Sequence, residues 1–169
     1  MTFLILTIVS AVALLGFITI GLVKFGLLQS YSAYATKWLE KYPNFSIWAF
    51  VTIVAAFLLV PPLIEVGSGH TLQFIGFLTP VYLIVVGLTP RWASNVNEHI
   101  VHSLFAGLCA AGAILWAIFI AHTWICIVYC AIFIFLVSFL TRTFMKGATF
   151  YLEMIAFLAI YSSLIYLFI

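Results

Sequence analysis

The chain has very little charge. Only 6% of its 169 residues are charged, aspartate is absent, and six Lys and Arg against four Glu give a formal net charge of +2. Soluble domains carry roughly a quarter charged residues. The composition therefore excludes a soluble globular domain and a disordered segment, and we expect no nucleic-acid partner.

Familiar chemical motifs are absent as well. The three cysteines, Cys109, Cys126 and Cys130, lie in apolar runs without C-x-x-C or zinc-finger spacing, so neither a disulfide framework nor a zinc ribbon is expected. The sequence has no glycine-rich phosphate loop, nucleophile elbow or dinucleotide fingerprint. We expect no cofactor and favour a protein that is not an enzyme.

Hydrophobic residues, in contrast, make up 67% of the chain, and the mean hydropathy is +1.33. A helix needs about 20 mostly apolar residues to cross a bilayer core. Continuous apolar runs indicate helices rather than alternating barrel strands. We predict an all-α membrane protein, a six-transmembrane-helix bundle that forms one domain over residues 1–169. A cytoplasmic interfacial segment is expected at 25–44. The spans are expected near residues 2–23, 45–66, 72–88, 98–121, 124–141 and 148–169.

The basic residues all fall in alternate connections between these spans. They are Lys24, Lys37, Lys41, Arg91, Arg142 and Lys146. Because basic loops stay in the cytoplasm, both termini are expected on the non-cytoplasmic side. We expect a multi-pass protein of the bacterial inner (plasma) membrane.

Aromatic residues recur at helical spacing in the segment 25–44. Tyr31, Tyr34, Trp38 and Tyr42 are three or four residues apart, with charged residues between them. The pattern suits an amphipathic helix in the headgroup region. A loop whose aromatic belt anchors the ends of the spans explains it equally well.

Ionisable residues inside membrane spans are costly and usually face the interior of a bundle. Glu98 and His102 share one helix face, which continues as a stripe of small side chains suited to close helix packing. Glu153 enters from the sixth span, so we predict a cavity open to the cytoplasm between spans four and six. Three residues of the interfacial segment are expected to close its mouth: Ser30, Ser32 and Tyr34.

Three interpretations of this set remain open. The residues could bind a ligand or relay protons, since histidine titrates near neutral pH. His99, His102 and Glu98 could instead bind zinc and activate water for hydrolysis. The simplest interpretation is structural pairing of Glu98 with Arg91 and of Glu153 with Lys146.

A second polar cluster is expected on the outer side. Glu65 follows Pro61 and Pro62, which are expected to break the second helix, and a short turn returns the chain to His70. His122, in the other outer turn, could join them. Zinc or haem ligation and simple interfacial capping are the alternatives.

Several short motifs resemble one group of membrane proteins. They are Gly26-Leu-Leu-Gln-Ser-Tyr-Ser-Ala-Tyr34, Pro61-Pro62-x-x-Glu65, Leu72-Gln-Phe-Ile-Gly-Phe-Leu78 and Val86-Gly-Leu-Thr-Pro90 followed by His99 and His102. Together they are similar to six-span proteins of gut Bacteroidetes and of the phages that infect them. A remoter likeness is to DRAM-like six-span proteins, in which a Gly-x-x-Pro loop also precedes a histidine. The resemblance implies no reaction, but it marks positions to test: Ser30, Ser32, Glu65, Gln73, Pro90 and His102.

These observations predict a polytopic inner-membrane protein that binds or translocates a small solute, proton or lipid through a cytoplasm-facing polar cavity. One alternative is a membrane-embedded, metal-dependent lipid hydrolase. Another is a structural or interaction membrane protein without a ligand. The expected partners are the lipid bilayer, a small solute or lipid, and, in a homo-oligomer, further copies of the chain.

Overall fold

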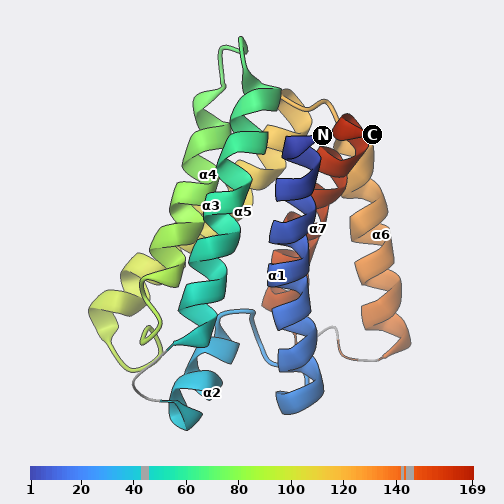
Figure 1. Ribbon diagram of the computed structural model, residues 1–169. Helices are drawn as coiled ribbons and strands as arrows, with labels where there is room; N and C mark the ends of the chain where they lie inside the picture. Colours follow the sequence, from blue (N-terminus) through green and yellow to red (C-terminus); the bar gives the residue numbers. More distant parts are fainter. Residues whose placement is uncertain (43–45, 142, 144–146) are drawn as a thin grey trace.

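Every regular element that the computed structural model describes, over residues 1–42, 46–141, 143 and 147–169, is a helix (Figure 1). The expectation of an all-α chain is confirmed for these residues. The helices are α1 (Thr2–Phe25), α2 (Ala33–Lys41), α3 (Ile47–Gly67), α4 (Phe74–Gly87), α5 (Val96–Phe119), α6 (Trp124–Leu140) and α7 (Ala148–Phe168).

In the described part of the chain, four helices are long and apolar enough to cross a membrane. These are α1 and α5, with 24 residues each, and α3 and α7, with 21 each. Helices α4 and α6 are also apolar but have only 14 and 17 residues. At 1.5 Å per residue α4 is about 21 Å long, which is less than the roughly 30 Å of a hydrocarbon core. The chain is therefore a helical membrane protein with at least four candidate spans.

A side-chain cap marks the start of α5, whereas two prolines lie within α3 without ending it. Asn95 caps α5, since its side chain accepts hydrogen bonds from Asn97 N and Glu98 N at 3.0 and 3.4 Å. Pro61 and Pro62 lie inside α3, which continues to Gly67. The expected helix break there is wrong, because the neighbouring helices of a membrane bundle help to accommodate the backbone groups that proline leaves unbonded.

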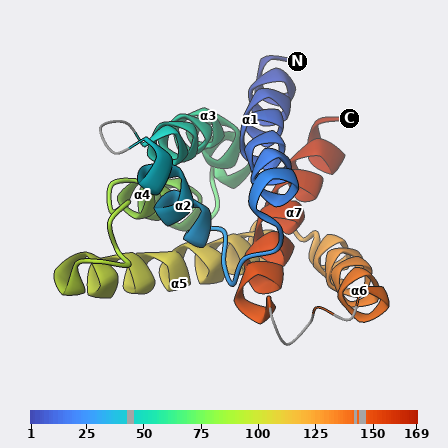
Figure 2. The same cartoon turned by 90° about the horizontal axis from the view of Figure 1, so that it is seen from below.

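Five helices form a closed ring. Helix α1 packs on α3, α3 on α4, α4 on α5, α5 on α7, and α7 returns to α1. Helix α6 lies outside this ring against α7, and α2 packs below α3 and α1 (Figure 2). The ring encloses a small cavity between α3, α4, α5 and α7, whereas most apolar side chains of α6 are exposed, as expected for lipid contact.

The two ends of the bundle differ in charge. Both termini lie at one end, and α2 and the α4–α5 connection lie at the other (Figure 1). Lys24 is in the last turn of α1, Lys37 and Lys41 are on α2, and Arg91 is in the α4–α5 connection, so all four belong to the α2 end. The remaining basic residues, Arg142 and Lys146, lie outside the described residues, as do residues 43–45 of the expected interfacial segment and second span.

Buried hydroxyl groups join the helices of the ring. Ser10 of α1 donates to the carbonyl oxygen of Ala55 of α3 at 2.8 Å, and its oxygen lies 2.7 Å from the Tyr161 hydroxyl of α7. Because the Ser10 proton is already used, the Tyr161 hydroxyl donates to Ser10. Such interhelical hydrogen bonds replace the hydrophobic driving force that lipid does not provide.

Helices α4 and α5 approach closely at Gly112. A Cβ added there would lie 2.5 Å from Thr79 Oγ1, and the Thr79 side chain is held by its hydrogen bond to the Ile75 carbonyl oxygen. We therefore expect Gly112→Ala to lower the free energy of unfolding by about 1–3 kcal/mol through overpacking. Unfolding by heat or denaturant in detergent micelles measures this change.

The matched control is Gly107→Ala on the same helix, because a Cβ at Gly107 meets no atom within 4 Å. Alanine at that position is expected to be neutral or slightly stabilising, since it favours the helix over glycine. Equal losses in the two variants would contradict the close contact between α4 and α5.

Candidate functional site

An open groove and a narrower cavity meet beside α5 and α7. The groove has a volume of about 420 Å³ and is lined mainly by α5, α7 and residues 29–32. The inner cavity, about 40 Å³, lies within the ring between α3, α4, α5 and α7. A cavity needs on the order of 10–15 Å³ to hold one water molecule, so the inner cavity has space for a few water-sized groups. Four residues line both spaces: Ser32, Ala106, Ala110 and Glu153.

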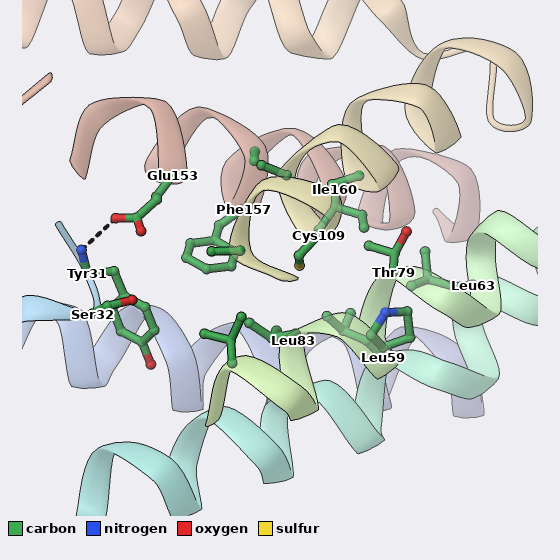
Figure 3. A pocket seen from close by; sticks show the side chains of 16 residues that line it. Tyr31, Ser32, Leu59, Leu63, Thr79, Leu83, Cys109, Glu153, Phe157 and Ile160 are labelled. Atoms are coloured by element: carbon green, nitrogen blue, oxygen red, sulfur yellow. Dashed lines mark hydrogen bonds between the residues drawn. The ribbon is translucent and has the colours of Figure 1, made fainter. Parts of the chain in front are cut away.

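The inner cavity has its carboxylate at one end only. Glu153, Tyr31 and Ser32 lie at that end, whereas Leu63 and Thr79 lie at the other (Figure 3). Between the two ends the walls are formed by apolar side chains and one thiol: Leu83, Cys109, Phe157 and Ile160. The combined space therefore changes from polar to apolar along its length.

The Glu153 carboxylate is held by the backbone of the segment before α2. Its Oε2 accepts a hydrogen bond from Tyr31 N at 2.6 Å. The Tyr31 hydroxyl lies 2.7 Å from Thr52 Oγ1 of α3, and Thr52 donates to the Trp48 carbonyl oxygen, so Tyr31 is the donor. Burial raises the pKa of the Tyr31 phenol, which keeps it protonated for this role.

His102 is buried and has a partner on each ring nitrogen. Its Nδ1 lies 2.9 Å from Thr89 Oγ1, and Thr89 donates to the Val86 carbonyl oxygen at 2.9 Å. Thr89 therefore accepts from Nδ1–H. The Nε2 atom, 2.7 Å from Ser32 Oγ, is left to accept from that hydroxyl. This pattern satisfies a neutral imidazole, which stacks on Trp92 at 5.2 Å between ring centroids.

The structure brings together part of the predicted cytoplasmic set. His102, Glu153, Ser30 and Ser32 all line the groove. In the described structure the two ionisable side chains do not bond each other, and each bonds the Tyr31–Ser32 segment instead. The groove is thus built around two consecutive residues that connect α7 to α5.

Tyr34 and Glu98 lie away from the groove. The Tyr34 ring packs against Gly21 of α1, and its hydroxyl donates to the Gly26 carbonyl oxygen at 2.9 Å. Glu98 accepts from the backbone N–H of Arg91 at 3.0 Å near the exposed start of α5. The expected pairing of Glu98 with Arg91 therefore involves the backbone amide of Arg91.

The residues considered for zinc are not arranged around one point. Within residues 1–42, 46–141, 143 and 147–169, no group of three or more His, Cys or Glu side chains is placed to hold a metal ion. His99 is exposed and stacks on Trp92 at 5.6 Å between ring centroids, whereas His102 is bonded on both nitrogens. Glu98 accepts from the Arg91 backbone N–H, so all three candidates have other packing or bonding partners.

The outer cluster is assembled in part. The rings of His70 and His122 meet edge to face with centroids 6.5 Å apart, and His70 Nδ1 accepts from Leu72 N at 3.2 Å. Glu65 is exposed in the last turn of α3. The two histidines belong to the α3–α4 and α5–α6 connections, which lie at the end of the bundle that carries the termini (Figure 1).

Sequence reasoning missed three groups of the site: the Tyr31 backbone N–H, the Thr89 hydroxyl and the Trp92 ring. Thr89 precedes Pro90, and Trp92 follows Arg91 in the α4–α5 connection. The only signal for a role of Thr89 and Trp92 was that they lie in a turn shortly before His102. No sequence pattern distinguishes a backbone N–H that binds a carboxylate.

Comparisons of the chain with protein-family models, curated proteins and solved structures found no match.

The Thr89–His102 contact can be tested by removing the hydroxyl. Thr89→Val keeps the shape of the side chain but leaves the Nδ1–H of His102 without an acceptor, which costs about 1–3 kcal/mol when the group is buried. We expect a corresponding loss in the free energy of unfolding in detergent micelles. Thr19→Val is the matched control, because the exposed Thr19 hydroxyl bonds only the Leu15 carbonyl oxygen of its own helix. Equal stability of both variants would show that the contact does not matter.

Proposed function

We propose that the chain is a six-span, multi-pass protein of the bacterial inner membrane with both termini on the non-cytoplasmic side. Six apolar helices and the gathering of Lys24, Lys37, Lys41 and Arg91 at the α2 end support this topology. The short helices α4 and α6 can be accommodated by local thinning of the bilayer. The resemblance to six-span proteins of gut Bacteroidetes and their phages agrees with the proposal.

Cysteine labelling tests the topology. With Cys109, Cys126 and Cys130 replaced by alanine, Lys37→Cys is expected to react with a membrane-impermeant maleimide only in inside-out vesicles. Ser68→Cys, in the exposed α3–α4 connection, is expected to react only in right-side-out vesicles. Labelling of both positions from the same side would overturn the topology.

We further propose that the protein binds a small amphiphilic molecule that enters from the cytoplasm. The observation that carries this proposal is the position of Glu153, which lines both the groove and the apolar cavity. A polar head would occupy the groove beside Glu153 and Ser32, and a short hydrocarbon chain would extend toward Leu63. Each buried methylene contributes about 0.8 kcal/mol, so even a short chain favours binding.

Binding is better supported than translocation. The inner cavity has a volume of only about 40 Å³ and is bounded by apolar residues of α3 and α4, including Leu63 and Leu83. Passage to the other side would need these helices to move apart. A bound amphiphile needs no such movement, because the groove is already open.

Native Cys109 reports on access to the cavity that it lines. In a variant with Cys126 and Cys130 replaced by alanine, we expect methyl methanethiosulfonate to modify Cys109 through the groove. Ala110→Trp fills the junction of the groove and the cavity, so the modification rate is expected to fall to near background. Mass spectrometry of the reconstituted protein measures the rate.

Leu104→Trp is the matched control, since Leu104 is an exposed residue on the same helix. It adds the same bulk without obstructing the groove, and modification of Cys109 is expected to continue. An undiminished rate in Ala110→Trp would show that the groove does not lead to the cavity, and the proposed route of entry would be wrong.

A further inference from the structure

The groove and cavity carry acidic charge only. Among the described residues that line them, Glu153 is the one carboxylate, and neither lysine nor arginine is present. Three other titratable groups lie near it: Tyr31 before α2, and His102 and Cys109 on α5. Tyr31 is a hydroxyl donor, His102 is satisfied as a neutral ring, and the Cys109 thiol is buried. None of them supplies a positive charge in this arrangement.

The Glu153 carboxylate has unused hydrogen-bonding capacity. Among the described residues it accepts one bond, from Tyr31 N to Oε2, whereas a carboxylate can accept about four. In a region of low dielectric an ionised carboxylate is costly unless it is paired. No described residue forms an ion pair with it, and Lys146 lies outside the described part of the chain. A proton or a cationic ligand at Oε1 would remove this cost.

We infer that the occupant of the site is a small organic cation with a short hydrocarbon chain, of the alkylammonium class, and that it competes with a proton for Glu153. This inference depends on the proposed function, because it specifies the ligand of the same site. The positive head would lie at the junction of groove and cavity, beside the carboxylate and the Ser32 hydroxyl (Figure 3).

Aromatic rings favour the same head group. Phe157 lines the cavity, next to the Tyr31 ring at 5.6 Å between centroids, whereas the Trp92 ring in the groove already stacks on His99 and His102. The faces of such rings attract cations, most strongly where water is excluded. The hydrocarbon chain would then lie between Leu83 and Ile160, in the apolar part of the cavity (Figure 3).

Competition with a proton follows from charge balance. When the site starts protonated, the entering cation pairs with the carboxylate and one proton is released to water. The total charge at the site is unchanged, so neither step leaves an unpaired charge in the membrane. By thermodynamic linkage, a proton weakens the binding of the cation as much as the cation weakens the binding of the proton.

The experiment compares three six-carbon probes by titration calorimetry on the full chain in lipid nanodiscs. Hexyltrimethylammonium has a positive charge that does not change with pH, hexanol is neutral and hexanoate is negative. We expect the cation to bind more tightly than the other two probes by about tenfold or more, as a charge-assisted contact provides. Glu153→Gln is expected to remove this preference.

Glu65→Gln is the matched control, because it removes an exposed carboxylate at the far end of α3. It should leave the preference for the cation unchanged. Lowering the pH should weaken binding of hexyltrimethylammonium to the native protein and to Glu65→Gln, with proton release on binding. The same change of pH should have no effect on Glu153→Gln.

The inference and the proposed function fail in different ways. Equal binding of hexanol and the cation, or a preference for the cation that persists in Glu153→Gln, would overturn the inference while the amphiphile site remains. Binding of none of the three probes, together with unreactive Cys109, would overturn both. If Glu153→Gln does not fold, the comparison of the three probes and the pH dependence in the native protein still decide the matter.

Discussion

Two consecutive residues connect three helices of the bundle. Tyr31 donates through its backbone to Glu153 of α7 and through its hydroxyl to Thr52 of α3, while Ser32 bonds His102 of α5. Inside a membrane an unpaired polar group is costly, so these groups must find partners within the protein. The segment before α2 therefore enters the bundle at the junction of α3, α5 and α7 and forms the wall where the groove meets the cavity.

The cavity exists because small side chains face one another where the helices do not touch. Ala106 and Ala110 line both the groove and the cavity, and Ala113 and Ala156 line the cavity. Elsewhere on α5, Gly112 is in close contact with Thr79 of α4. Small residues permit both arrangements, and the larger side chains around them decide which one forms. A polar groove can thus open between α5 and α7 without weakening the contact between α4 and α5.

Sequence reasoning located the site in part. The helical spacing and the cost of charge in lipid indicated that His102 and Glu153 face inward, and both line the groove. The same reasoning placed Tyr34 at the mouth, but its ring packs on Gly21 instead. Periodicity identifies the residues that share a helix face, but it does not determine which neighbour that face meets. The aromatic residues of the segment 25–44 show the same limit, since Tyr31 is 1% exposed and Tyr42 is 40% exposed.

Composition and charge distribution alone determined that the chain is an all-helical membrane protein, because lipid permits few backbone structures and long apolar runs are unambiguous. The sequence also indicated that His102 and Glu153 would face inward. Only the tertiary structure decided that α6 lies outside the ring, that α3 continues through its two prolines, and that a backbone N–H holds Glu153. These features depend on contacts between residues far apart in the chain, and such contacts leave no local pattern in the sequence.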